Sequence, residues 1–223
     1  MDCINILDGK YQILRVTPDL YDETEELLTD LSVNHELTCL ATKLKDSPVA
    51  ISELRALVRY VLSCGISFAI RHVCSGRIVS AVANIIFNEK KYSIYELTEY
   101  RCPKMIKYNK LWRDLEVSYN IYKEWEMDSI LEIAYLATHL DFRCRGLAFQ
   151  LFKHTIDFAR LMSEEKLPSD LILKDMQMEI PKGVMTMLTS PYSRKCGYKL
   201  GLEIVKTWPI SDWGVVELQA IKF

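Results

Sequence analysis

The chain has 223 residues, is 49% hydrophobic and 26% charged, and carries a net charge of −2 at pH 7. These values are typical of a globular protein and fit a single domain over residues 1–223. With no basic excess, membrane-spanning run or secretory signal, we expect no nucleic-acid or membrane partner and a cytoplasmic monomer. The seven cysteines are an odd number without a C-x-x-C pair, so we expect reduced thiols and no metal site.

The first half of the sequence predicts one strand, two helices and a β-hairpin. Thr17-Pro18-Asp19 combines an N-cap, a proline at the first helical position and a first-turn acid, so a helix should begin there. Cys74-Ser75-Gly76 is a turn between two β-rich runs. In chain order we expect a strand over Tyr11–Val16, helices from Thr17 to about Ser32 and from Asp46-Ser47-Pro48 to Gly65, and strands over Ile66–Val73 and Arg77–Asn88.

The second half predicts a long helix, a central strand, a second helix and further strands. Over Lys104–Glu124 apolar and aromatic residues recur three and four apart, which indicates one buried helix face rather than a ligand site. The later elements are a strand over Leu131–Thr138, a helix after Gly146, a strand over Gly183–Thr189, a short helix over Pro191–Lys195, and an antiparallel pair over Gly201–Thr207 and Gly214–Ile221. Leu167–Pro181 stays open between helix and strand. The pattern predicts an α+β fold with a mixed, mostly antiparallel sheet.

The stretch Leu136–Ala148 carries the most specific chemical signal, because it contains R-x-x-G-x-A with Arg143, Gly146 and Ala148. A turn of small residues entering a helix presents unpaired backbone N–H groups to one point, with the positive end of the helix dipole behind them. Such a turn can bind a diphosphate, and Arg143 and Arg145 add positive charge beside it. The alternative is an ordinary strand-to-helix turn.

The order of a strand, this loop, an amphipathic helix, another strand and a short serine-rich helix resembles the GNAT superfamily of N-acetyltransferases, from about Tyr11 to Val205. The resemblance implies a twisted mixed sheet flanked by helices, with acetyl-CoA as co-substrate and no metal. In the superfamily the loop holds the pyrophosphate of acetyl-CoA, and the preceding strand pairs with the pantetheine arm. The corresponding residues here are Leu136, Ala137, Thr138, Arg143, Cys144, Arg145, Gly146, Leu147 and Ala148. Thr138-His139-Leu140 departs from the usual Val-x-Pro.

The segment Asn34-His35-Glu36-Leu37-Thr38 narrows the resemblance to the insect arylalkylamine N-acetyltransferases, in which an Asp-Glu-Pro-Leu type segment carries a catalytic glutamate. The resemblance implies that Glu36 deprotonates the amine, directly or through a water. A base is needed because the pKa of an alkylammonium group is about 10. His35 and Leu37 depart from the family pattern. Glu36 as a solvated acid after a helix, or His35 as the base, are the alternatives.

A second segment, Thr189-Ser190-Pro191-Tyr192-Ser193, resembles the S-S-x-Y-S type segment of the same enzymes, whose serines act in catalysis or active-site hydrogen bonding. The resemblance implies such roles for Thr189 and Ser193. The superfamily often has a tyrosine as general acid four residues before a Gly-Phe, and that offset falls here on Ser193, before Gly197-Tyr198. Tyr192 is an alternative acid. A serine-rich helix cap is the alternative without chemistry.

Together these segments predict an acetyl-CoA-dependent N-acetyltransferase that transfers the acetyl group directly to a primary amine in a ternary complex. Arylalkylamines, polyamines and agmatine stay open as acceptors. Two other functions also stay open. One is an acyltransferase that uses longer acyl-CoA or an amino-acid acceptor such as glycine, and the other is a CoA-binding module without turnover.

Overall fold

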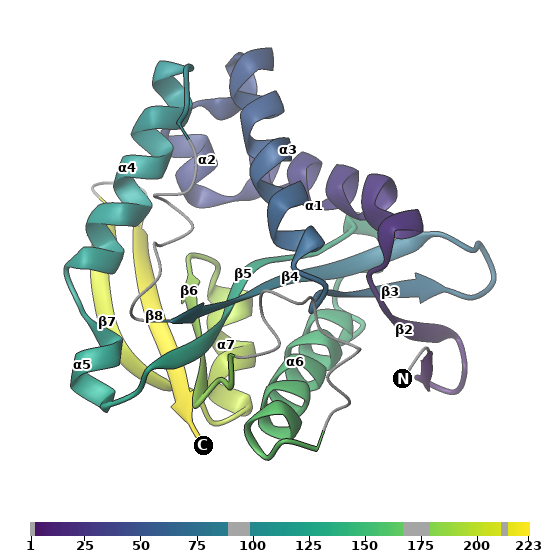
Figure 1. Ribbon diagram of the computed structural model, residues 1–223. Coiled ribbons are helices and arrows are strands. Elements are labelled where there is room, and N and C mark those ends of the chain that lie inside the picture. Colours follow the sequence, from purple (N-terminus) through teal and green to yellow (C-terminus); the bar gives the residue numbers. More distant parts are fainter. Residues whose placement is uncertain (1–2, 89–98, 167–178, 211–213) are drawn as a thin grey trace.

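A computed structural model describes residues 3–88, 99–166, 179–210 and 214–223. In these residues eight strands form one twisted sheet in the order β1-β2-β3-β4-β5-β6-β8-β7 (Figure 1). The strands are β1 (Ile4–Ile6), β2 (Tyr11–Arg15), β3 (Phe68–His72), β4 (Ile78–Asn88), β5 (Ser129–Thr138), β6 (Gly183–Leu188), β7 (Glu203–Ile210) and β8 (Gly214–Lys222). Only β5 and β6 pair in parallel, so the predicted α+β class with a mixed, mostly antiparallel sheet is confirmed.

Helices cover both faces of this sheet. α1 (Tyr21–His35) packs on β4 and β5, and α3 (Pro48–Ser63) packs on α1 and β4, whereas α6 (Leu147–Ser163) lies on the opposite face (Figure 1). α7 contacts α6, β6 and β8. The shorter or outer helices are α2 (Leu37–Ala41), α4 (Pro103–Val117), α5 (Ile121–Trp125) and α7 (Pro191–Lys199), and 3-10 turns occupy Pro18–Leu20, Leu44–Asp46 and Leu140–Phe142.

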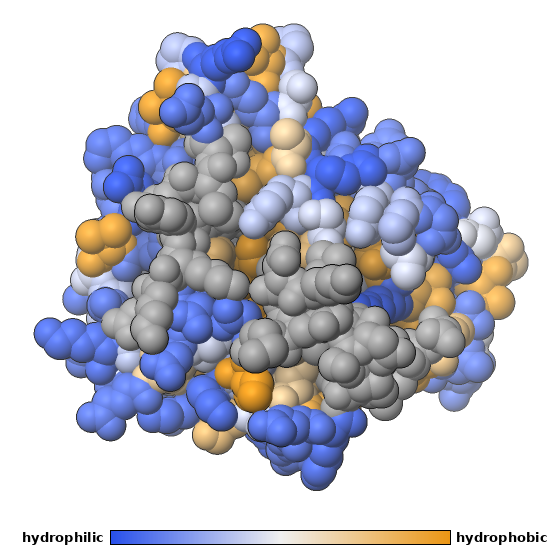
Figure 2. Space-filling view, in the orientation of Figure 1, coloured by the Kyte–Doolittle hydropathy of each residue, from blue (hydrophilic) through white to orange (hydrophobic). Residues whose placement is uncertain are grey.

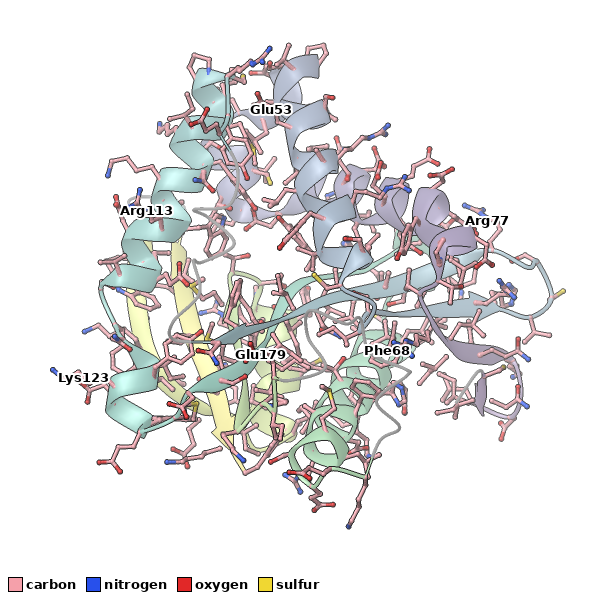
Figure 3. All side chains as sticks on the ribbon, in the orientation of Figure 1. Glu53, Phe68, Arg77, Arg113, Lys123 and Glu179 are labelled. Atoms are coloured by element: carbon pink, nitrogen blue, oxygen red, sulfur yellow. The ribbon has the colours of Figure 1, made fainter. Side chains whose placement is uncertain are left out.

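The core is centred on β4, which is buried along almost its whole length. Helices lie on both of its faces, and its sequence is accordingly an almost continuous apolar run. Below the sheet, Phe68 of β3 makes edge-on ring contacts with His154 and Phe158 of α6 (Figure 3). Figure 2 shows that hydrophilic residues cover most of the coloured rim of this face, as expected outside such a core.

The predicted single helix over Lys104–Glu124 is wrong, because the structure has two helices there. α4 ends at Val117, and Asn120 begins α5 by accepting a hydrogen bond from the N–H of Lys123 at 3.0 Å. The predicted buried face is confirmed for α4, where the buried residues are Met105, Tyr108, Trp112 and Leu115. At its other end α4 is tied to α3, since Glu53 accepts from the N–H groups of Arg101 and Cys102 (Figure 3).

Other boundaries also differ from the predictions. α1 begins at Tyr21 after the 3-10 turn and continues through His35, three residues beyond the predicted Ser32. α7 extends to Lys199 rather than Lys195, and β1 was not predicted. Of the ambiguous segment 167–181, residues 167–178 lie outside the described residues.

Candidate active site

β5 and β6 run side by side only where they begin. Their ladder consists of Leu131–Val184 and Glu132–Met185, although β5 continues to Thr138 and β6 to Leu188. Past Glu132, β5 pairs with β4 on one edge, while its edge toward β6 pairs with no strand in the described parts of the chain. We call this opening between β5 and β6 the fork. A strand edge of this kind can bind an extended ligand as an added strand.

The predicted pantetheine-binding residues Leu136, Ala137 and Thr138 form the β5 side of the fork, and all three are half-buried. Neighbouring side chains hold their backbone. The Ser80 hydroxyl donates to the Ala137 carbonyl at 3.0 Å, and Arg143 Nε donates to the Thr138 carbonyl at 3.3 Å. The backbone of this stretch is therefore fixed before any ligand binds.

The loop from β5 to α6 follows the fork directly and has two residues in the left-handed region, Cys144 with φ 60° and Gly146 with φ 79°. Gly146 is the N-cap of α6, and no side chain caps this helix. The first N–H groups of α6 therefore lack a capping side chain. A Cβ on Gly146 would find no heavy atom within 4 Å, so the space over the loop is open. Bare N–H groups at the positive end of a helix dipole form a geometry that binds anions.

The side chain of Arg145 braces this loop. Its guanidinium donates to the Tyr11 hydroxyl at 3.2 Å and to the Asp141 carbonyl at 2.8 Å. It also lies over the Phe142 ring, 5.1 Å from the centroid. Arg145 thus links the loop to β2 while its charge stays next to the N-terminus of α6, which we call the mouth of this helix. The sequence predicted the charge but not the contact with Tyr11, 134 positions earlier.

Glu36 lies between α1 and α2 and is the N-cap of α2. Its carboxylate accepts from the N–H groups of Thr38 at 2.9 Å and Cys39 at 2.8 Å, and from the Thr38 hydroxyl. A fourth bond comes from the Thr189 hydroxyl, whose Oγ1 donates to Glu36 Oε1 at 3.0 Å. Each carboxylate oxygen accepts two hydrogen bonds, which is the full in-plane capacity of an ionised carboxylate. Glu36 is therefore a fixed, half-buried acceptor rather than a solvated surface acid.

Thr189 and the β5 segment meet at the open end of the fork. Leu136 and Thr189 each lie four residues past the last ladder pair, Glu132–Met185, and the two strands are parallel. The carboxyl ends of parallel strands meet at one edge of a sheet, so Thr189, Glu36 and Leu136–Thr138 share that edge. The loop before α6 continues from the same end of β5. The structure thus joins the predicted Glu36 and Thr189 by a hydrogen bond and places the predicted strand residues on the same edge of the sheet, across the fork.

Ser193 and Tyr192 lie on α7, which begins right after Thr189. The Ser193 hydroxyl donates to the Ser190 carbonyl at 2.9 Å, and Ser190 caps the helix through the N–H of Tyr192. Ser193 is half-buried. The Tyr192 side chain is 80% exposed, so it does not point into the protein. The segment is a serine-rich helix cap that follows Thr189 directly.

A polar cluster holds α7 against β8, and the sequence reasoning missed it. Glu217 accepts from Arg194 at 3.1 Å, from the Tyr198 hydroxyl at 3.3 Å and from Gln219 Nε2 at 2.8 Å. Gly197 allows this approach, because a Cβ there would lie 1.9 Å from Gln219 Oε1. Glu217 and Gln219 are buried polar residues in the largely apolar sequence of β8. That pattern could have indicated the cluster from the sequence.

Two thiols near the site, those of Cys39 and Cys196, are poor nucleophiles. Burial and the neighbouring charge of Glu36 raise the pKa of the Cys39 thiol, so it stays protonated at neutral pH. Burial also raises the pKa of Cys196. Cys144 is exposed in the loop. Within the described ranges no cluster of three or more His, Cys, Asp or Glu side chains is arranged to hold a metal, and no helix is long and apolar enough to cross a membrane.

Neither a protein-family profile nor a curated protein sequence matches the chain. Solved structures do match along nearly its whole length. An arylalkylamine N-acetyltransferase 7 from the mosquito Aedes aegypti is 15% identical with a TM-score of 0.78, over 99% of this chain and 92% of that chain. Arylalkylamine N-acetyltransferase 2 from Aedes aegypti is 16% identical with a TM-score of 0.71, over 95% and 98%.

A polyamine N-acetyltransferase of Drosophila melanogaster, which forms N-acetylagmatine, is 18% identical with a TM-score of 0.66, over 96% of this chain and all of that chain. At such identities the likeness establishes the fold. The chain has the GNAT fold, as its sequence predicted, with the strand, loop and helix of the predicted site in their expected order.

Proposed function

We propose that the protein is an N-acetyltransferase that moves the acetyl group of acetyl-CoA to a primary amine by direct transfer in a ternary complex. The observation that carries the proposal is the hydrogen bond from Thr189 to Glu36 at the open end of the fork. Thr189 follows β6, while the neighbouring β5 has an unpaired edge past Glu132 and leads into the start of α6, which no side chain of the described residues caps. The structural neighbours that act on arylalkylamines, polyamines and agmatine support the same reaction.

Acetyl-CoA fits the loop and the fork. The N–H groups of Cys144, Arg145, Gly146, Leu147 and Ala148 are proposed to bind its pyrophosphate, helped by the positive end of the α6 dipole. The N–H of Arg143 was also predicted to bind it, but it donates to the Leu140 carbonyl at 3.2 Å, so Arg143 would contribute only the charge of its side chain. The open space over Gly146 leaves room for such an anion. Leu136, Ala137 and Thr138 would pair with the pantetheine amides along the free edge of β5. Acetyl-CoA supplies an activated thioester. The residues of this chain would bind it and accept the proton that the amine loses.

The proton of the amine is proposed to reach Glu36 through Thr189. All four in-plane positions of the Glu36 carboxylate are occupied, so an amine cannot reach it without displacing a donor. The Thr189 oxygen, in contrast, gives its own hydrogen to Glu36 and keeps lone pairs for another donor. When the amine nitrogen attacks the thioester carbonyl, it would pass a proton to Thr189 Oγ1, and Thr189 would pass its own proton to Glu36 Oε1.

Ser193 is proposed to complete the site from the first turn of α7. Its hydroxyl hydrogen is bound to the Ser190 carbonyl, which leaves its oxygen free to accept a hydrogen bond. That arrangement suits the orientation of the CoA thiol or a water better than acid catalysis. Tyr192 is too exposed to protonate a buried thiolate, so the departing thiolate would take its proton from solvent.

Release of free CoA thiol from acetyl-CoA, measured against a panel of primary amines, tests the function. We expect wild type to turn over at least one amine. We expect no turnover by Glu36→Gln at low pH, where most of the amine is protonated and a base is needed most. Residual activity of the variant should rise with pH as free amine increases. Asn120→Ala, which removes a helix cap of the same kind away from the site, controls for lost stability.

The same assay distinguishes the alternatives. Faster thiol release from longer acyl-CoA, or with glycine as acceptor, would change the substrate assignment. Calorimetric binding of CoA without thiol release against any amine would make the chain a CoA-binding module. A pH–rate profile of Glu36→Gln parallel to that of the wild type would reject Glu36 as the base.

A further inference from the structure

The proposed reaction does not use Glu132, a buried carboxyl at the closed end of the fork. Glu132 belongs to the last ladder pair of β5 and β6 and is only 2% exposed. Its Oε2 atom is buried and has no hydrogen-bond partner among the residues that the structure describes. Buried polar atoms are almost always paired, because an unpaired one destabilises the fold. An unpaired carboxyl oxygen where the two strands of the fork part therefore calls for a donor from outside the described residues.

The groups around Glu132 are acidic and aromatic. The charge of Glu116 on α4 adds to the effect of burial, and together they raise the pKa of Glu132 to about 8. No cationic side chain among the described residues contributes to that shift. Tyr135, three residues further along β5, senses the charge of Glu132 and contacts Tyr108 of α4. Carboxylates next to aromatic rings are the combination that binds alkylammonium or guanidinium groups.

Neighbouring side chains link the surroundings of Glu132 to Glu36, which with Thr189 forms the proposed catalytic pair. Cys39 binds Glu36 through its N–H and contacts Tyr108 through its thiol, and Tyr108 in turn contacts Tyr135. Glu132 lies four residues from the level of Thr189 along parallel strands. At about 3.3 Å per residue, this separation is about 13 Å. A flexible diamine of that length can reach from one end of the fork to the other.

We propose that Glu132 recognises a second cationic group on the acceptor, so that the enzyme prefers di- or polycationic amines over monoamines. The inference rests on the proposed acetyl transfer, since it names the acceptor class of that site. The second ammonium or guanidinium group supplies the donor that Glu132 Oε2 lacks. Because the free carboxyl holds a proton, binding of the cation releases that proton to solvent and leaves a buried ion pair.

The test compares 1,8-diaminooctane with octylamine, which has the same chain and a single charge. With acetyl-CoA, wild type should have a kcat/KM for the diamine at least about tenfold above that for octylamine. Glu132→Gln, which keeps the shape and removes the charge, should lose at least about tenfold for the diamine, mainly through KM. It should leave octylamine within about twofold. Glu203→Gln, at an exposed carboxylate on β7, is the control and should change neither.

The outcomes separate the inference from the function it rests on. Equal losses for both amines, or no loss for the diamine, would overturn the inference and leave the acetyltransferase intact. Absence of turnover with every amine would overturn the proposed function instead. In that case calorimetric titration of both amines into the CoA-bound chain still decides the inference, since tighter binding of the diamine in wild type but not in Glu132→Gln is required.

Discussion

Thr189 occupies an unusual position for a threonine that follows a strand. Its hydroxyl donates to a carboxylate that also caps a helix, so the carboxylate is held by backbone groups that cannot rotate away. Fixed donors of this kind orient an acid–base group without any rearrangement during the reaction. The start of α2 thus fixes the position of the proposed base, and the proton of the amine would reach it through the Thr189 hydroxyl.

Substitution of Thr189 tests that route at the level of one oxygen atom. Thr189→Val keeps the shape and removes the hydroxyl, so we expect kcat to fall by about 10²-fold, the size of a lost general-base step. Thr189→Ser restores the oxygen and should stay within a few-fold of wild type. Thiol release at saturating acetyl-CoA measures both. Equal activity of the two variants would show that protons reach Glu36 without the hydroxyl.

No local pattern could have predicted this contact. Glu36 and Thr189 are 153 positions apart, and each appeared in the sequence only as part of a short segment that resembles a known family. The resemblance named both residues as candidates, but not the bond between them. Three of the four hydrogen bonds to the carboxylate come from Thr38 and Cys39. They form because Glu36 lies in the turn between α1 and α2 and caps α2.

Among the elements, those with strong end signals were predicted well and those without were not. α3 has Ser47 as N-cap and Pro48 at its first position, and both signals hold in the structure. The long helix over Lys104–Glu124 was predicted wrongly, because its apolar spacing continues across the break at Ser118–Asn120. Asn120 is an effective N-cap, yet a single asparagine within a periodic segment is a weak stop signal.

The loop before α6 allows a matched comparison of two glycines. Gly146 and Gly76 have φ of 79° and 70°, and a Cβ on either would meet no atom within 4 Å. Alanine at either position should therefore destabilise the fold similarly, by about 1 kcal/mol of backbone strain. Only Gly146→Ala places a methyl group in the open space beside the N-terminus of α6.

We therefore expect Gly146→Ala to weaken CoA binding by about tenfold or more, because an anion could no longer approach the backbone closely. Gly76→Ala, in the β3–β4 turn, should bind CoA like wild type. Calorimetric titration of CoA measures both, and thermal unfolding checks that their stabilities match. Unaltered CoA affinity in Gly146→Ala would contradict the proposed pyrophosphate site.

For the whole molecule, the sheet order explains why the site lies where it does. Among the described strands, the order in the sheet departs from chain order only at the edge, where β8 lies between β6 and β7, and the one parallel pair is β5–β6. The sequence predicted a mixed sheet, but the short ladder that opens the fork follows from three-dimensional packing. Side chains such as Thr186, which binds the Ile133 carbonyl at 3.0 Å, end the ladder where the strands part.

Because Glu132 is buried in the sheet, its ionisation makes the stability of the fold depend on pH. Its pKa is raised to about 8 by burial and by Glu116, whereas an unfolded glutamate titrates near 4.3. The protonated folded form is thus favoured below the unfolded pKa, and its stability is lost as pH rises through about 8.

Between pH 5 and 9 wild type should lose roughly 4 kcal/mol more unfolding free energy than Glu132→Gln, which cannot ionise. Urea unfolding of both chains at each pH measures this, with Glu203→Gln, an exposed carboxylate, expected to follow wild type. Parallel stability curves for wild type and Glu132→Gln would mean that Glu132 is ionised and paired in solution, and that the closed end of the fork is already occupied.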